Sequence, residues 1–215
     1  MFKVFAKSIV LCAGLALTAF SHAAGSYLEG THYEVVAEQA TTKPEVKEFF
    51  SFYCPACFAF DPYVNSLEKS LPDGTVVKKY HVDFMGAASK EIQAQLTQVL
   101  VLAKAKGKGA EVGQALFNHI HVKRQPFASA EDIRVVATAA GIDPAIYDKE
   151  INSFAVKSQT KLMQKEQEQF SKSKVLNSVP TIIVNGRYKI INQSLDKTNT
   201  EQDFKALVQH LLAKP

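Results

Sequence analysis

Residues 48–60, EFFSFYCPACFAF, place an aromatic, apolar run directly before a Cys-x-x-Cys pair. The apolar run, residues 46–53, has the length and composition of a β-strand. Pro55 fits the first turn of a helix, because proline fixes φ near the helical value and lacks only an N–H that would have no partner there. Cys54 is therefore predicted at a helix N-terminus, with Cys57 one turn inside. Apolar residues then recur at helical spacing: Phe60, Val64, Leu67 and Leu71.

The predicted position of Cys54 decides its chemistry. A sulfur at a helix N-terminus faces unpaired backbone N–H groups and the positive end of the peptide dipoles. The amides of Ala56 and Cys57 are available there, whereas Pro55 has none. A thiolate is stabilised by these groups and a thiol is not, so the pKa of Cys54 should fall. We expect Cys54 to be the attacking or attacked sulfur, and the more shielded Cys57 to be the resolving sulfur.

The first 23 residues have the three-part pattern of a cleaved secretory signal. A lysine-bearing start precedes the apolar residues 8–20, and residues 21–23 (SHA) form a small-x-small cleavage site. The apolar segment is too short to span a bilayer, although an uncleaved N-terminal anchor is the alternative interpretation. Cys12 follows Leu11, where a lipoprotein signal needs a small residue. We therefore expect Cys12 to be removed with the signal.

Removal of the signal leaves a nearly neutral chain. Two of the 25 basic residues and none of the 21 acidic ones lie in it, so 23 face 21 and the net charge is +2. This balance gives no argument for binding nucleic acid or an anionic membrane. The two remaining cysteines, Cys54 and Cys57, close too short a loop to stabilise the fold much. About 190 residues can also bury a core without disulfides, so the pair points to redox chemistry.

Glu48 is an anomaly in the strand before the cysteines. Its side chain is expected to share a face with Val46, Phe50 and Phe52, in a segment with the composition of a strand buried on both sides. The ordinary interpretation is that Glu48 lies at a strand edge, where its carboxylate reaches solvent. The alternative is a buried ionisable group beneath the cysteines that accepts or supplies a proton. Lys79, on the following strand, is a candidate partner for it.

The pattern around this stretch predicts an α/β fold in two halves. Further strands are predicted over residues 30–36 and 76–84. Pro62 is expected to kink the helix that joins the strand at residues 46–53 to the strand at residues 76–84. A strand, a helix and a strand of these lengths form a right-handed βαβ unit. Near the C-terminus, Asn185-Gly186 joins two β-rich runs and is a strong hairpin signal. The runs and the amphipathic helix after them cover residues 181–184, 187–191 and 200–212.

Between the two halves the chain carries no convincing strand. We predict a central mixed sheet flanked by helices, formed by residues 24–86 and 171–215, with an all-helical domain inserted at residues 87–170. Capping residues and glycines set the expected helix ends. The expected helices cover residues 91–106, 111–121, 129–141, a short segment after Asp143-Pro144, and 154–170.

This arrangement resembles the thioredoxin superfamily, and much more closely its DsbA-type periplasmic thiol:disulfide oxidoreductases. The similarity covers essentially the whole chain after the signal. A Cys-x-x-Cys pair alone is a weak signal, but Pro55 within it, Val-Pro before a hairpin and the ordered helical insert together make a strong one. The matching segments are 48–52 (EFFSF), Cys54/Cys57, 79–82 (KYHV), 84–86 (FMG), 152–154 (NSF), 156–158 (VKS), 179–180 (VP) and 184–186 (VNG).

The resemblance implies a role for each matched site residue. Cys54 would be the exposed nucleophile and Cys57 its buried partner. Pro180 would be a cis proline beside the disulfide, without an N–H to compete near the sulfurs. Val179 would supply the backbone that pairs with an extended substrate. Glu48 would be the family's buried acid, and Lys79 would be the lysine beside that acid.

One residue departs from the family pattern. DsbA-type proteins commonly carry His at the second inner position of the motif, after Pro55, where this chain has Ala56. A cationic, hydrogen-bonding His near Cys54 favours the thiolate, whereas Ala offers only its backbone amide. We therefore expect a milder oxidant than the His-bearing relatives.

The reaction expected from the resemblance is donation of the Cys54–Cys57 disulfide to newly exported proteins with reduced cysteines, in the periplasm. Reoxidation would then need a DsbB-like, quinone-linked membrane protein. The resemblance implies no metal, nucleotide, flavin or other cofactor beyond the redox-active disulfide, and no nucleic acid, and the protein is expected to act as a monomer.

Three alternatives stay open at the level of sequence. A periplasmic reductase or isomerase uses the same motif, and reduction potential rather than motif decides direction. The known isomerase lineage carries an N-terminal dimerisation domain, and the about 30 residues between the expected cleavage site and Cys54 leave no room for one. A metal carrier would use Cys54, Cys57 and His119 or His121, although zinc favours four ligands. A peptide-binding chaperone with idle cysteines would keep its activity in a Cys54→Ser variant.

Overall fold

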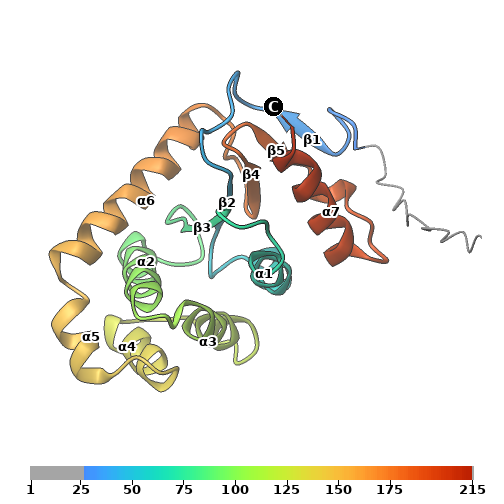
Figure 1. Cartoon of the computed structure of the whole chain (residues 1–215). Helices are drawn as coiled ribbons and strands as arrows, with labels where there is room; N and C mark the ends of the chain where they lie inside the picture. The colour runs from blue at the N-terminus through green and yellow to red at the C-terminus, as the bar shows by residue number, and fades with distance from the viewer. Residues whose placement is uncertain (1–26, 215) are drawn as a thin grey trace, which may run out of the picture.

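A five-stranded mixed sheet forms the centre of the computed structural model, which describes residues 27–214 (Figure 1). The expected signal sequence, including Cys12, lies outside the described residues. The strand order is β1-β5-β4-β2-β3, with β2 and β3 parallel and the other neighbours antiparallel. The strands are β1 (Tyr33–Val35), β2 (Glu45–Phe50), β3 (Val76–His81), β4 (Thr181–Val184) and β5 (Tyr188–Ile190).

The sequence of elements confirms the thioredoxin-like plan, with a βαβ half and a ββα half. The β4–β5 connection is the predicted hairpin, and both Asn185 and Gly186 adopt positive φ, as this tight turn requires. A short 3₁₀ turn covers Asn192–Ser194. The helices are α1 (Pro55–Glu68), α2 (Lys90–Ala105), α3 (Gly109–His121), α4 (Ala130–Ala139), α5 (Pro144–Glu150), α6 (Phe154–Lys172) and α7 (Thr200–Leu212).

Two predicted strands extend too far towards the site. The strand expected to reach residue 53 ends at Phe50, because Ser51 accepts hydrogen bonds from the amides of Tyr53 and Cys54 and turns the chain. Phe52 therefore does not continue the face of Glu48. The strand expected to reach residue 84 ends at His81.

The five helices between β3 and β4 form a block beside the sheet (Figure 1). Ser89, Ser129, Asp143 and Ser153 cap four of them by accepting a hydrogen bond from a first-turn amide. The boundaries expected for an inserted domain stay predictions, and α6 continues to Lys172, beyond the expected boundary at residue 170. The core of the block includes Leu96, Leu116, Phe117 and Ile133, and it is continuous with Phe52, Cys54 and Cys57. The cysteines thus lie where the helical block meets the sheet.

The last helix of the block packs on the opposite face of the sheet from α1 and α7. Phe170 of α6 contacts Phe49 of β2 at 5.2 Å between ring centroids, while Val46 of the same strand packs with α1 and α7. Gln167 accepts a hydrogen bond from the Asp83 amide. The last hydrogen bond between β2 and β3 runs from the Val82 amide to the Phe50 carbonyl at 2.8 Å, and β2 ends at Phe50, so β3 has no strand partner beyond this point.

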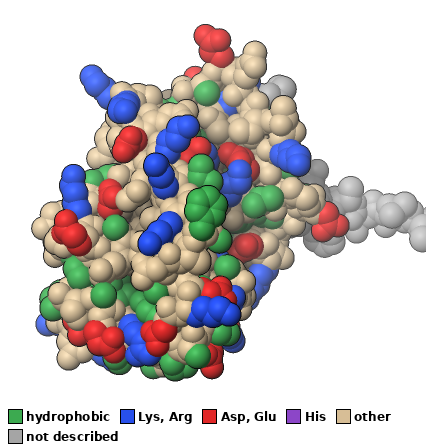
Figure 2. Space-filling view, turned by 90° about the vertical axis from the view of Figure 1, so that its left-hand side faces the viewer, with side chains coloured by type: hydrophobic (Ala, Val, Ile, Leu, Met, Phe, Trp, Pro, Cys, Tyr) green, Lys and Arg blue, Asp and Glu red, His purple; other side chains and the backbone are tan. Residues whose placement is uncertain are grey.

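The face that carries α5 and α6 shows charges of both signs, interspersed with separate hydrophobic side chains (Figure 2). Phe154, at the start of α6, is the most exposed of the large hydrophobic residues in the described part of the chain. Within residues 27–214, no helix is long and apolar enough to cross a membrane.

Candidate active site

Cys54 is the N-cap residue of α1, as the sequence predicts. The turn before it is held by the Ser51 carbonyl, which accepts a hydrogen bond from the Cys54 amide at 3.1 Å. Pro55 occupies the first helical position, and the Cys57 amide donates to Cys54 Sγ at 3.2 Å. The helix N-terminus therefore presents a backbone donor directly to the sulfur.

The two free thiols have pKa values displaced in opposite directions. A hydrogen bond from the Cys57 thiol, with the amides of Cys57 and Ala56, lowers the pKa of Cys54 to about 6, against the opposing effects of burial and of the Glu48 charge. The hydrogen bond to Cys54 and burial raise the pKa of Cys57. Near neutral pH the pair therefore holds a thiolate at Cys54 and a thiol at Cys57, and the thiolate is the nucleophilic form.

Cys54 is less accessible than the resemblance implied. It is 5% exposed, whereas Cys57 is fully buried and the neighbours Pro55 and Ala56 are exposed. The nucleophile is thus less exposed than expected. As the N-cap side chain, Cys54 Sγ points towards the first-turn amides of α1 and not out into solvent. Its Sγ lies 3.4 Å from the Val179 carbonyl oxygen, which belongs to the segment that covers it.

The covering segment precedes β4. The Val179–Pro180 peptide bond is cis, as the resemblance implied. Both residues are partly exposed, and the Pro180 carbonyl accepts a hydrogen bond from the Asn192 side chain at 2.8 Å. A partly exposed backbone segment therefore lies beside the reactive sulfur.

Behind the cysteines, Glu48 and Lys79 form the predicted buried pair. They are opposite each other in the β2–β3 register, and Lys79 Nζ lies 3.5 Å from Glu48 Oε2. Glu48 is 1% exposed, so the interpretation of an acid at a strand edge is wrong. Lys79 also pairs with Asp61 of α1, which accepts a further hydrogen bond from Asn65 at 2.7 Å.

Asp61 is a site residue that sequence reasoning missed. Its signal is a charged residue at position 61 of a helix whose neighbouring positions, Phe60 and Val64, lie on the buried face. Burial raises the pKa of Glu48, although Lys79 opposes this change. Burial lowers the pKa of Lys79, but the charges of Glu48 and Asp61 outweigh it and raise that pKa above its ordinary value. Two carboxyl groups thus share one buried ammonium group.

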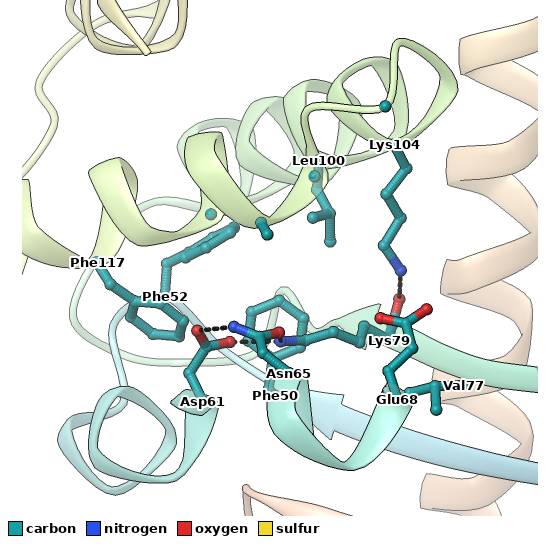
Figure 3. A pocket seen from close by; sticks show the side chains of 14 residues that line it. Phe50, Phe52, Asp61, Asn65, Glu68, Val77, Lys79, Leu100, Lys104 and Phe117 are labelled. Carbon is teal, nitrogen blue, oxygen red and sulfur yellow. Dashed lines mark hydrogen bonds and ion pairs between the residues drawn. The ribbon is translucent and has the colours of Figure 1, made fainter. Parts of the chain in front are cut away.

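A cavity of about 380 Å³ opens beside this cluster, between α1, β3, α2 and α3 (Figure 3). Phe50, Phe52 and Phe117 form its apolar wall. Lys104 of α2 reaches it from the rim, with Nζ 3.4 Å from the Lys79 carbonyl oxygen. Although Lys104 as a residue is exposed, burial of its ammonium among the walls and repulsion by Lys79 lower its pKa to about 8. The cavity gives the charged cluster a polar opening towards solvent.

The two histidines considered as metal ligands have other partners. His119 stacks on Phe127, and His121 contacts the carbonyl oxygen of Phe52. Among residues 27–214, no group of three or more His, Cys, Asp or Glu side chains is arranged to hold a metal ion.

Comparison with known proteins matches this geometry to one family. Residues 45–203 match the family model described as a DSBA-like thioredoxin domain. The thiol:disulfide interchange protein DsbA of Salmonella typhimurium is 37% identical over 97% of this chain and 99% of its own length. That of Escherichia coli K12 is 37% identical over 94% of this chain and 96% of its own length.

Solved structures show the same similarity. The disulfide oxidoreductase DsbA from Proteus mirabilis has a TM-score of 0.76 and 33% identity, covering 87% of this chain and 98% of that one. A complex of the Proteus protein with a non-covalently bound peptide, PWATCDS, has a TM-score of 0.75 and 32% identity, covering 87% of this chain and 99% of that one.

Proposed function

This chain belongs to the DsbA-like thioredoxin domain family and is a thiol:disulfide oxidoreductase, and on this premise we propose that Cys54 and Cys57 carry the exchange. The observation that carries the proposal is the position of Cys54 at the N-cap of α1, with the Cys57 amide 3.2 Å from its sulfur. No other pair of cysteines exists among the described residues.

The proposed direction is donation of a disulfide to a substrate dithiol. A substrate thiolate attacks Cys54 Sγ of the oxidised enzyme, a mixed disulfide forms, and Cys57 leaves as a thiolate that takes up a proton. A second substrate thiolate then attacks the substrate sulfur of the mixed disulfide, and Cys54 leaves as a thiolate. The substrate loses two electrons and the enzyme gains them. Leaving is favoured at Cys54, because a thiol of lower pKa is the better leaving group.

The charged cluster beneath the cysteines is proposed to assist proton transfer. Glu48 is the buried acid that we propose accepts a proton from Cys57 or supplies one to it. The negative charge of Glu48 raises the pKa of both cysteines. Lys79 holds that charge in place at 3.5 Å. We propose that the redox chemistry needs no further cofactor, because both electrons reside in the cysteine pair.

We propose that the substrates are extended, reduced segments of newly exported proteins, in the periplasm. Val179 presents backbone beside Cys54, which suits pairing with an extended peptide strand. The Proteus relative binding a cysteine-containing peptide supports this class of substrate. A DsbB-like, quinone-linked membrane protein is proposed to reoxidise the Cys54/Cys57 pair after each turnover.

The direction of exchange is tested by two measurements on the purified protein. One is the equilibrium of the cysteine pair with reduced and oxidised glutathione, and the other is oxidation of a dithiol peptide. An equilibrium that favours the reduced enzyme, together with rapid peptide oxidation, would support the donor role. A potential near that of thioredoxin would instead identify a reductase.

The reactivity of reduced Cys54 is expected to follow a titration near pH 6. The rate of alkylation by iodoacetamide should rise with pH, reach half its maximum near that value and level off by pH 8, whereas an ordinary cysteine titrates near 8.5. Because the folded pKa is depressed, the thiolate stabilises the reduced fold above pH 8.5, and this contribution is lost as pH falls through 6. The melting temperature of the reduced form should therefore fall relative to that of the oxidised form as the pH is lowered through 6. A midpoint above pH 8 would contradict the assigned role of Cys54.

An Ala56→His variant is expected to be a stronger oxidant than the natural protein. Ala56 is exposed beside Cys54, so a histidine there could add a cationic donor to the existing backbone amides. Each unit by which the pKa of Cys54 falls is worth about 1.4 kcal/mol, or roughly 30 mV in a two-electron couple. The glutathione equilibrium measures this change, and an Ala56→Gln variant controls for size without charge. If Ala56→His leaves both the pKa and the equilibrium unchanged, the expectation is wrong.

A further inference from the structure

His121, the last residue of α3, reaches from the helical block to the turn that precedes Cys54. Its Nε2 lies 2.8 Å from the carbonyl oxygen of Phe52. A carbonyl oxygen only accepts hydrogen bonds, so Nε2 must carry the proton and donate it. The His121 ring also stacks on Phe58 of α1, with 5.1 Å between ring centroids and 9° between the planes.

These two contacts fall on either side of the reactive sulfur. Phe52 lies in the turn between β2 and Cys54, and Phe58 lies in the first turn of α1, where its amide donates to the Cys54 carbonyl at 3.1 Å. The turn and the helix start are the elements that aim the Cys57 amide at Cys54 Sγ. One side chain from outside the sheet therefore restrains both parts of the site.

We propose that His121 is a positioning residue for thiol–disulfide exchange, holding the Cys54 turn against the start of α1 through the Phe52 carbonyl and the Phe58 ring. It touches neither sulfur in this role and acts through the backbone that carries Cys54. The proposal rests on the proposed function of the cysteine pair, and it links the helical block to the redox properties of the site.

His119 provides a matched comparison within the same helix. It also stacks on a phenylalanine, Phe127, with 4.5 Å between ring centroids and 10° between the planes. Phe127 lies in the loop after α3 and not in the Cys54 turn. Loss of either histidine removes a stacked ring from the block, but only loss of His121 releases the Phe52 carbonyl.

The test compares His121→Ala, His121→Phe and His119→Ala with the natural protein. His121→Phe keeps an aromatic ring for Phe58 but has no donor for Phe52. Three quantities are measured: the glutathione equilibrium constant, the pKa of Cys54, and the melting temperatures of the oxidised and reduced forms. Loss of one positioning hydrogen bond should change the equilibrium constant about three- to tenfold.

Both His121 variants are expected to be weaker oxidants with a raised Cys54 pKa, and to lose more stability in the reduced form than in the oxidised form. His119→Ala should lower both melting temperatures equally and leave the equilibrium unchanged. The proposal is overturned if His121→Ala lowers the melting temperatures of the oxidised and reduced forms equally, as loss of a purely structural residue would. If the natural protein itself fails to oxidise a dithiol peptide, the donor function fails independently of how these variants compare.

Discussion

A Cys57→Ser variant is expected to lose all turnover of a dithiol peptide and to become trapped as a covalent adduct through Cys54. When the variant meets a peptide disulfide, the Cys54 thiolate attacks one sulfur and releases the other peptide thiolate. The resulting mixed disulfide persists, because the resolving thiol beside Cys54 in the natural protein is Cys57, and the serine that replaces it in the variant cannot attack a disulfide. Non-reducing electrophoresis and intact mass spectrometry would detect the adduct.

Cys54→Ser is the matched control for this result. It should lose turnover equally but form no adduct, because Cys57 is fully buried and its pKa is raised. Residual turnover in either single variant would contradict the two-cysteine mechanism. An adduct that formed on Cys57 in the control would show that the assigned order of attack is reversed.

A Lys79→Met variant is expected to destabilise the protein by about 3–5 kcal/mol at pH 7, the usual cost of removing one partner of a buried ion pair. Lys79 is the ammonium between Glu48 and Asp61, and its side chain is 12% exposed. Its loss leaves two buried carboxyl groups without their cation. Urea unfolding at several pH values measures the effect.

The pH dependence of this loss has a definite sign. The pKa of Glu48 is already raised in the folded protein, and removal of Lys79 raises it further. A group whose folded pKa is raised stabilises the fold at low pH and loses that contribution as pH rises through the folded value. The cost of Lys79→Met should therefore be smaller at pH 5 than at pH 7.

Lys78→Met is the control on the same strand. Lys78 pairs with Glu45 at 2.6 Å, but its side chain is 43% exposed, so its loss should cost less than about 1 kcal/mol. If both variants lost the same free energy of unfolding, burial of the Glu48 cluster would not increase the contribution of its ion pairs to stability.

Local chemistry made much of this molecule predictable from its sequence. The helix start at Cys54 follows from Pro55 and the apolar spacing after it, and the hairpin follows from Asn185-Gly186. The Glu48–Lys79 pair was foreseen because both residues lie on adjacent strands of one βαβ unit. In each case the deciding interaction involves residues near in sequence or joined by a simple topological rule.

The parts that sequence reasoning missed depend on how distant elements dock. Asp61 enters the charged cluster because α1 packs on the face of β2 that carries Glu48. The Phe52 carbonyl meets His121 because the helical block packs against the active-site turn. The cover over Cys54 Sγ comes from Val179, which is 125 residues away in the chain. Periodicity and capping signals carry no information on such distances.

The pairing of β2 with β4 has a consequence for the newly made chain. The cysteines and the helix amides that hold them are synthesised early, but the Val179–Pro180 segment that covers Cys54 arrives only with β4. At ribosomal speeds of about 5–20 residues per second, the gap of roughly 126 residues lasts about 6–25 s. During that interval Cys54 lacks the cover that the Val179–Pro180 segment gives it in the finished fold.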